Sequence, residues 1–376
     1  MKLSCMQTNF NKALNITEKA ISKTSTLPIL ANILLETDKG RLKLSATDLE
    51  IGIIYWLGAQ IQTHGSITIP ARLLSSFVNS LPNKKIDILG RGNNLNLKCE
   101  SFKASIKGLS SKDFPLIPKI KEKPLVSLPI PVLYRAFSQV TPATAVSQTR
   151  PEISGVFICF SNQEIKIAAT DSYRLAEKRI QNTNKKLGQP ISIIVPSRTI
   201  YELIRVFGEQ EGEVEIVLGE NQVLFKLDNI NLVSRLIEGQ YPDYEQIIPK
   251  KSKTQAIAST SELLSAVKSA SLFAGRTDEI KLSFKNTGRN AVLEIKAESD
   301  DKGSNVSQVK IKLNGSQNTI IFNYRYLLDG LQNILTDVVE LGINDDKTPA
   351  LLKPFTEPGK RPKDKDYLYL IMPIKN

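Results

Sequence analysis

The alternation of apolar and polar positions predicts the same set of elements three times along the chain. In the first stretch, Phe10, Leu14 and Ile21 recur at helical spacing, so a helix is expected over residues 10–22. A second helix is expected over residues 71–81 after Pro70, because proline favours the first helical position. Its buried side chains are expected to be Leu73, Leu74, Phe77 and Val78. Alternating strands are predicted at residues 29–36, 41–46, 51–57, 66–69, 85–89, 94–99 and 102–107.

Several landmarks then recur with a period near 125 residues. Pro70 and Pro196 lie 126 residues apart, and Thr47 and Thr170 lie 123 apart. A fainter third copy places Arg325 127 residues beyond Arg198. We therefore predict an α+β protein of three repeated domains, each with two helices packed on antiparallel sheets. The expected domains are residues 1–120, 128–250 and 254–376, with a proline-flanked linker around residues 119–123.

Composition narrows the class of protein. The formal net charge of +12 favours a polyanionic partner, nucleic acid above all, although a merely basic surface is the alternative. Cys5, Cys99 and Cys159 stand far apart in strand-like stretches, which indicates free buried thiols and a reducing compartment. No apolar run approaches the roughly 18 residues of a membrane-spanning helix. We expect a cytoplasmic protein with no membrane partner.

Catalytic chemistry is hard to assemble from this sequence. Its one histidine, His64, stands beside Gly65 in an expected turn, where a surface role is more usual than catalysis. There is no GxxxxGK[ST] phosphate loop, and Gly90-Arg91-Gly92 is typical of a hairpin turn. The acidic pairs at 300–301 and 345–346 do not have the periodicity of a calcium loop. We therefore expect no enzyme activity, no metal site and no cofactor.

Cations recur on equivalent predicted helices of every repeat. Such a stripe is often only a solvated face. Its recurrence in three copies favours a surface that faces phosphates, where contacts are insensitive to base sequence and weakened by salt. The expected DNA-facing residues are Lys12, Lys19, Arg72, Arg135, Arg198, Arg205, Lys268 and Arg325.

One turn carries an unusual set of side chains. A strand at residues 165–169 runs into Thr170-Asp171-Ser172 and then presents an aromatic, a cation and an aliphatic residue together. The same tripeptide frame occurs at Ala46-Thr47-Asp48 with a different continuation. Apolar residues near the repeat boundaries suit either an adaptable peptide-binding surface or a core between domains. They are Tyr173, Leu175, Pro242, Ile247, Leu370 and Met372.

At ATDSYRLA, VPSR, GQYPDYEQIIP and the terminal YLYLIMPIKN, the chain resembles the bacterial DNA polymerase III beta subunit, the beta sliding clamp family. TLPIL (Thr26 to Leu30) and ATDLE agree as well, so the resemblance covers essentially the whole chain. It implies three domains of one fold, joined head-to-tail into a homodimeric ring around duplex DNA. The implied role is a non-catalytic processivity factor that tethers the replicative polymerase, the clamp loader, repair polymerases and other clients carrying short linear motifs.

The resemblance also implies particular sites. The client pocket carries over to Ile153, Thr170, Ser172, Tyr173, Arg174, Leu175, Pro242, Gln246, Ile247, Leu370 and Met372. The ring interface carries over to Ala104 and Ile106 of one chain against Leu272 and Phe273 of the other. The chain departs from the family at Tyr173, where a histidine is frequent, at Gln246, where a basic residue can occur, and at Ala104, where an aromatic can stand. These departures bear on client preference and ring stability, and residues 353–366 are expected to form a basic, mobile insertion.

Two other readings fit the sequence less well. A monomeric nucleic-acid-binding adaptor of the same fold would share the cationic helices but not the ring. A hydrolase would need a site that no motif indicates.

Overall fold

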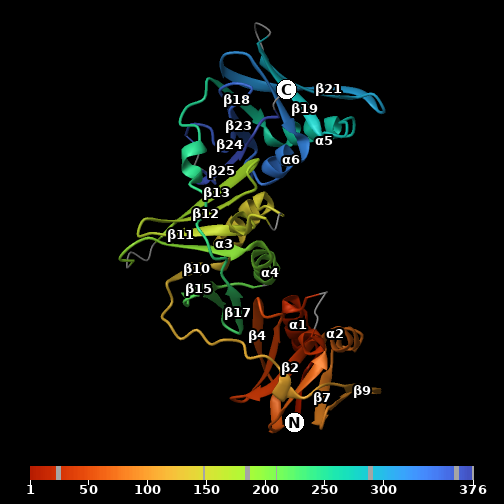
Figure 1. Cartoon of the computed structure of the whole chain (residues 1–376). Helices are drawn as coiled ribbons and strands as arrows, with labels where there is room; N and C mark the ends of the chain where they lie inside the picture. The colour runs from red at the N-terminus through yellow and green to blue at the C-terminus, as the bar shows by residue number, and fades with distance from the viewer. Residues whose placement is uncertain are drawn as a thin grey trace. The chain divides into compact units, whose positions relative to one another are not determined.

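The computed structural model describes residues 1–22, 27–146, 149–182, 187–208, 210–286, 291–359 and 364–374 (Figure 1). These residues belong to two units, one formed by residues 1–134 and 198–236 and the other by residues 135–197 and 237–376. The central repeat therefore contributes to both units. Thr26 of the TLPIL run and the last two residues of the terminal segment lie outside the described residues.

The first repeat contains two helices, α1 (Gln7–Thr17) and α2 (Ala71–Asn79). Its strands are β1 (Lys2–Met6), β2 (Asn32–Asp38), β3 (Arg41–Thr47), β4 (Ile51–Gly58), β5 (Gln60–Thr63), β6 (Ser66–Pro70), β7 (Lys85–Arg91), β8 (Asn94–Cys99) and β9 (Phe102–Lys107). The helix predicted over residues 10–22 thus begins and ends earlier than expected. The prediction for Leu73 is wrong, because its side chain is 55% exposed. The buried stripe of α2 runs through Ala71, Leu74, Ser75 and Val78, and Leu73 lies beside it.

The second and third repeats reproduce this order of elements. The second comprises β10 (Val126–Pro129), α3 (Ile130–Val140), β11 (Gly155–Phe160), β12 (Glu164–Thr170), β13 (Arg174–Gln181), β14 (Ile191–Pro196), α4 (Ser197–Phe207), β15 (Glu213–Leu218), β16 (Gln222–Lys226) and β17 (Ile230–Arg235). The third comprises β18 (Thr254–Ser259), α5 (Thr260–Ser271), β19 (Glu279–Asn286), β20 (Ala291–Ser299), β21 (Gly303–Gly315), β22 (Asn318–Asn323), α6 (Tyr324–Gln332), β23 (Val338–Ile343), β24 (Ala350–Phe355) and β25 (Tyr367–Ile371). The predicted α+β fold of three repeats is confirmed.

Sheets continue from one repeat into the next. In the first unit, the described strands form a sheet ordered β5-β1-β7-β8-β9 and another ordered β10-β15-β16-β17-β4-β3-β2-β6. In the second unit they are ordered β14-β11-β12-β13-β25-β24-β23-β18-β21-β20-β19-β22. The last strand of a repeat pairs antiparallel with the fourth strand of the preceding repeat, β17 with β4 and β25 with β13. Backbone hydrogen bonds therefore join consecutive repeats.

The segment between the first two repeats covers one of these sheets. Ile117 and Ile120 pack against Val217, Leu224 and Val233, which lie side by side on β15, β16 and β17. A Cβ atom added to Gly52 on β4 would lie only 2.8 Å from Ile117. The linker is therefore seated closely on the sheet.

The end of the expected mobile insertion is anchored. Lys353 to Phe355 belong to β24, and the Asp364 side chain is only 2% exposed and forms a 2.5 Å ion pair with Lys178. Gln139 Nε2 also donates to Asp364 Oδ2 at 2.6 Å. The prediction of a mobile insertion is therefore wrong at both ends of the segment, whereas residues 360–363 lie outside the described residues.

Candidate peptide-binding site

The turn from Thr170 to Arg174 is held by its own side chains. Asp171 Oδ1 accepts hydrogen bonds from the backbone N–H groups of Tyr173 and Arg174, both at 2.9 Å. Thr170 Oγ1 donates to the carbonyl of Arg174 at 2.6 Å and accepts from the N–H of Ser172 at 3.2 Å. Ser172 has φ +77°, a conformation that costs a non-glycine residue energy and is tolerated here because the surrounding bonds fix it.

The corresponding turn in the first repeat uses the same bonds. Asp48 Oδ1 accepts from the N–H groups of Glu50 and Ile51, and Leu49 has φ +81°. Threonine and aspartate in this order therefore build one frame twice, because both side chains bond to nearby backbone groups. The residues presented after the aspartate differ between the copies.

Arg174 links the turn to α6. Its Nε lies 2.9 Å from Asp171 Oδ2, and its Nη1 pairs with Asp329. Its guanidinium carbon lies 4.5 Å from the ring centroid of Tyr326, which is within the range of a cation–π contact. Burial alone would lower the pKa of Arg174, but Tyr369, Asp329 and Asp171 outweigh burial and raise the pKa. The cation is thus fixed in place rather than free to swing.

Tyr173 lies beside this arginine and remains accessible. Its side chain is 62% exposed, and its ring is stacked near that of Tyr326 with the ring centroids 6.3 Å apart. The Tyr173 carbonyl accepts from the N–H of Met372 at 2.8 Å, directly after β25. The turn and the terminal segment are therefore joined by backbone at the site.

The apolar floor of the site is a cluster of buried side chains. Leu175 and Leu370 are paired across β13 and β25, and both are fully buried. Ile153 belongs to the same cluster, and Met372 packs against it while remaining partly exposed. The structure therefore brings these four predicted residues together in one cluster.

The segment between β17 and β18 brings two aromatic residues to this cluster. Tyr241 and Tyr244 are buried in it, and the Tyr241 ring stacks on Phe157 at 4.9 Å between centroids. Tyr244 Oη donates to the buried carboxylate of Glu177 at 2.7 Å. Burial, together with Glu177, raises the pKa of Tyr244, so this tyrosine stays protonated and donates to the carboxylate.

The remaining predicted residues lie on the same segment. Ile247 is 48% exposed, Pro242 is half-buried, and exposed Gln246 donates to Asp243 at 2.6 Å. Ile247 and Tyr173 are thus accessible apolar side chains, and Leu175 and Leu370 form the closed floor. An accessible apolar rim beside a fixed cation suits an extended peptide with bulky side chains.

Two partners of the site were missed by sequence reasoning. Tyr326 and Asp329 sit one turn apart on α6, far from the turn in sequence, and both contact Arg174. Their spacing on one helical face was a usable signal only once α6 was known to face the turn.

The predicted DNA-facing cations occupy equivalent places in the repeats. Arg72, Arg198 and Arg325 are each the second residue of a helix, α2, α4 and α6. Arg198 pairs with the nearly buried Asp48, and Arg325 with Asp278 at 2.7 Å. The charges of Arg198 and Arg325 are therefore partly neutralised within the chain.

The other predicted cations lie on or beside the remaining helix surfaces. Arg205 is paired with Glu202 at 3.0 Å, and Lys19 donates to the carbonyl of Arg205 at 3.2 Å. The side chains of Lys12, Arg72, Arg135 and Lys268 are exposed. The side chains of Arg205 and Arg325 are 65% and 64% exposed as well, so their ion pairs leave them accessible to solvent.

The predicted ring-interface residues differ in exposure. Leu272 is 69% exposed, and Ala104 and Phe273 are half-buried. Ile106 is only 4% exposed, because its side chain points into the core of the first repeat. It could therefore contact another chain through its backbone on β9, not through its side chain.

Three further features concern chemistry and location. In the described ranges, no group of three or more His, Cys, Asp or Glu residues could hold a metal ion. None of the helices in those ranges is long and apolar enough to cross a membrane. Burial raises the pKa of the Cys5 thiol to about 12, which makes it a poor nucleophile.

Comparison with known proteins identifies the fold and its role. The family models for the N-terminal, central and C-terminal domains of the DNA polymerase III beta subunit match residues 1–118, 127–243 and 245–375. The beta sliding clamp of Synechocystis sp. is 30% identical, and the match covers 100% of this chain and 99% of the relative.

Solved structures of sliding clamps have the same fold as this chain over its whole length. The DNA polymerase sliding clamp from Bacillus subtilis has a TM-score of 0.92 and 27% identity, over 100% of this chain and 99% of that one. The clamp from Pseudomonas aeruginosa bound to griselimycin has a TM-score of 0.91 and 26% identity, over the whole of both chains.

Because the three clamp-domain models match consecutive parts of this chain, the chain is a DNA clamp. DNA clamps are a class of non-catalytic replication proteins. The chain belongs to the DNA polymerase III beta subunit family, the beta sliding clamps, and serves as a processivity factor of DNA polymerase III. The resemblance found in the sequence is confirmed.

Proposed function

We propose that two copies of this chain close head-to-tail into a ring of six domains around duplex DNA. The proposal rests on two strand edges that have no partner strand in the described structure. Within the chain, β17 pairs with β4 and β25 pairs with β13, and these two pairings are called here the internal junctions. In the described structure β9 pairs only with β8, and residues 303–310 of β21 pair only with β20. β9 is the counterpart of β17 and β25, and β21 is the counterpart of β4 and β13. Pairing β9 with β21 of a second chain repeats the internal junctions.

Exposed apolar side chains gather near these edges. Phe102 on β9 is 47% exposed, whereas its counterparts Ile230 and Tyr367 are at most 2% exposed because a preceding repeat covers them. Leu73 and Leu272 are also largely exposed. Burying such side chains against a second chain supplies the hydrophobic contribution that closure requires.

The mass of the protein in solution tests ring closure. Sedimentation equilibrium should give twice the mass of one chain at micromolar concentration. A monomer over the whole concentration range would contradict the ring and favour the monomeric adaptor. Replacing Phe102 and Leu272 by Asp should give monomers with unchanged far-UV circular dichroism, whereas Leu116→Asp, at a 95% exposed position in the linker, should remain dimeric.

Inside such a ring, we propose that the exposed helix cations contact DNA phosphates weakly and without base specificity. Topological linkage replaces tight binding, so that sliding meets no deep energy minimum. Contact with linear DNA should weaken markedly between about 50 and 200 mM salt. A flat salt response would argue against a cationic inner face.

We further propose that the cluster around Tyr173, Arg174 and Met372 receives short client motifs with a glutamine and bulky apolar residues. The support is an accessible apolar rim, a closed apolar floor and a fixed cation within one unit. Replicative and repair polymerases and the clamp loader would bind there and be held at high local concentration. With these partners, the proposed location of the protein is the bacterial cytoplasm.

Peptide affinity tests this assignment. Met372→Ala combined with Ile247→Ala should abolish binding of a synthetic peptide with one glutamine and bulky apolar residues. Griselimycin, bound in the Pseudomonas relative, serves as a second probe and should compete with the peptide. Unchanged affinity in the double variant, with the dimer intact, would refute the pocket without touching the ring.

A further inference from the structure

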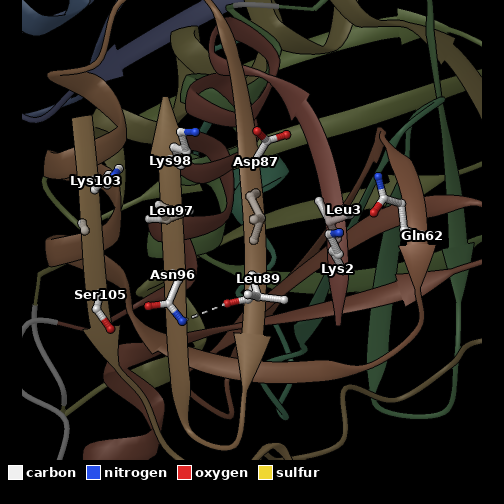
Figure 2. A pocket seen from close by; sticks show the side chains of 12 residues that line it. Lys2, Leu3, Gln62, Asp87, Leu89, Asn96, Leu97, Lys98, Lys103 and Ser105 are labelled. Atoms are coloured by element: carbon white, nitrogen blue, oxygen red, sulfur yellow. Dashed lines mark hydrogen bonds between the residues drawn. The ribbon is translucent and has the colours of Figure 1, made fainter. Parts of the chain in front are cut away.

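The outer face of the first repeat's five-stranded sheet contains a hollow of about 620 Å³, called here the sheet hollow (Figure 2). All of its lining residues lie on β1, β5, β7, β8 and β9. Leu89, Asn96 and Ser105 form one row across it, because Leu89 pairs with Asn96 and Asn96 with Ser105. Figure 2 shows Asp87, Lys98 and Lys103 in the next row.

The same row exists in the second repeat, where it is covered. Met6 and Pro129 both precede the first helix of their repeat, and they pair with Lys85 and Glu213. Counting along the strands from these pairs aligns Leu89 with Val217. The ladders then align Asn96 with Leu224 and Ser105 with Val233.

In the second repeat, this row is the seat of an extended segment. Val217, Leu224 and Val233 are each at most 5% exposed, with Ile117 and Ile120 of the linker packed on them. A Cβ atom added to Gly219 would meet Ile120 at 3.6 Å, an ordinary contact distance. The linker therefore follows the sheet surface closely.

The third repeat also uses this row. The counterparts of Leu89, Asn96 and Ser105 are Gly342, Leu351 and Leu370, which pair in the same order. Leu370 is fully buried in a cluster with Tyr241 and Tyr244, which belong to the second linker. A linker segment thus packs on this row in two repeats, whereas no described segment covers it in the first repeat.

The hollow carries more positive charge than the equivalent surface of the second repeat. Asp87 and Lys98 have counterparts of the same sign, Glu215 and Lys226, which form a 2.7 Å ion pair. Lys103 is paired with Lys98, however, where the second repeat has Asn231 paired with Lys226. Exposed Lys2, Lys98 and Lys103 thus line the hollow together with Asp87, whereas the linker over the second repeat carries Lys119, Lys121 and Lys123. An occupant of the sheet hollow should therefore be acidic.

We propose that the sheet hollow binds an extended acidic segment of a partner protein. The segment lies over β7, β8 and β9 as the linker lies over β15, β16 and β17, with an apolar side chain on Leu89 and carboxylates toward the three lysines. A peptide is favoured over a nucleic acid because polypeptide segments pack on both equivalent rows, and the segment on the second repeat is extended. This site is separate from the proposed client pocket. It shares β9 with the proposed ring interface, so the mass of each variant in solution is measured alongside its peptide affinity.

A peptide taken from the chain's own linker provides the probe. A labelled synthetic peptide of residues 116–123 with Lys119→Glu, Lys121→Glu and Lys123→Glu should bind the full-length protein saturably in fluorescence anisotropy. Lys98→Glu combined with Lys103→Glu should weaken binding about tenfold or more, since both charge contacts become repulsive. The unmodified linker peptide should also bind at least about tenfold more weakly than the acidic peptide.

Two further double variants serve as a charge control and as a test of the apolar row. Lys250→Glu with Lys251→Glu makes the same charge change at exposed residues elsewhere and should leave the affinity unchanged. Asn96→Leu with Ser105→Val restores the apolar row of the second repeat and should tighten binding several-fold. Equal affinity in the Lys98/Lys103 and Lys250/Lys251 variants would overturn the proposal. The proposal would also be overturned if oligothymidylate displaced the peptide and its own binding required Lys98 and Lys103. The hollow would then be a nucleic-acid site.

Discussion

The buried ion pair between Lys178 and Asp364 makes a sharp prediction about what holds β25 in place. Lys178 lies on β13 with its side chain 10% exposed, and Asp364 is 2% exposed. Lys178→Met removes one charge and leaves the carboxylate buried, with Gln139 as its other side-chain donor among the described residues, at 2.6 Å. Removing one partner of a buried pair costs about 3–5 kcal/mol. For a unit of this size, that lowers the melting temperature by roughly 6–20 °C.

Differential scanning calorimetry measures this loss, because it separates the transitions of a protein with more than one unit. Lys178→Met with Asp364→Leu removes both charges and should recover most of the loss. Lys166→Met is the matched control, because its 2.5 Å pair with Glu245 is more exposed and should contribute at most about 1 kcal/mol. A shift for Lys178→Met no larger than the control's, or a double variant as unstable as the sum of its parts, would refute the reasoning.

Three further predictions follow from other parts of the structure. The register of the internal junctions places Ala104 opposite Asn305 of a second chain, so Ala104→Cys with Asn305→Cys should give a covalent dimer on a non-reducing gel. Neither single variant should do so, and cross-linking by Ala104→Cys with Val306→Cys instead would indicate another register. Tyr326→Ala should lower client-peptide affinity about fivefold because Arg174 loses its aromatic support, and Tyr326→Phe should restore it. Burial raises the pKa of Cys5 to about 12 and raises the pKa of Tyr241 and Tyr369. The unfolded state therefore loses these protons first, and urea midpoints should fall as pH rises above about 9. Cys5→Val should flatten the beginning of that fall, and an unchanged slope would contradict this account of the thiol.

Much of the fold was predictable because the repeats carry local signals. Proline before the second helix, the threonine–aspartate turn and strand alternation each act over a few residues, so their recurrence is visible in sequence. Leu73 shows the limit of predicting burial from local sequence. Its apolar character suggested burial, but the exposed position on α2 depends on which stripe of the helix meets the sheet.

Some residues of the candidate site could likewise be predicted from the sequence, and others could not. Tyr173, Leu175, Leu370 and Met372 were found because they end strands at repeat boundaries or match the family. Tyr326 and Asp329 were missed because nothing near them in sequence tells which turn α6 faces. Likewise, the charge of Arg198 was visible, but its partner Asp48 lies 150 positions away in the sequence and is brought near it by the pairing of β17 with β4.

The pairing of β17 with β4 has a consequence for how the chain can be cut. Because the junction is made of backbone hydrogen bonds between strands, a protease nick in the linker over residues 119–123 would sever the covalent link without separating the first two repeats. The fragments should elute together in native buffer and part only in denaturant. The peptide bonds of the linker are then not needed to hold neighbouring repeats together once the chain has folded, because the repeats are joined by their shared sheets.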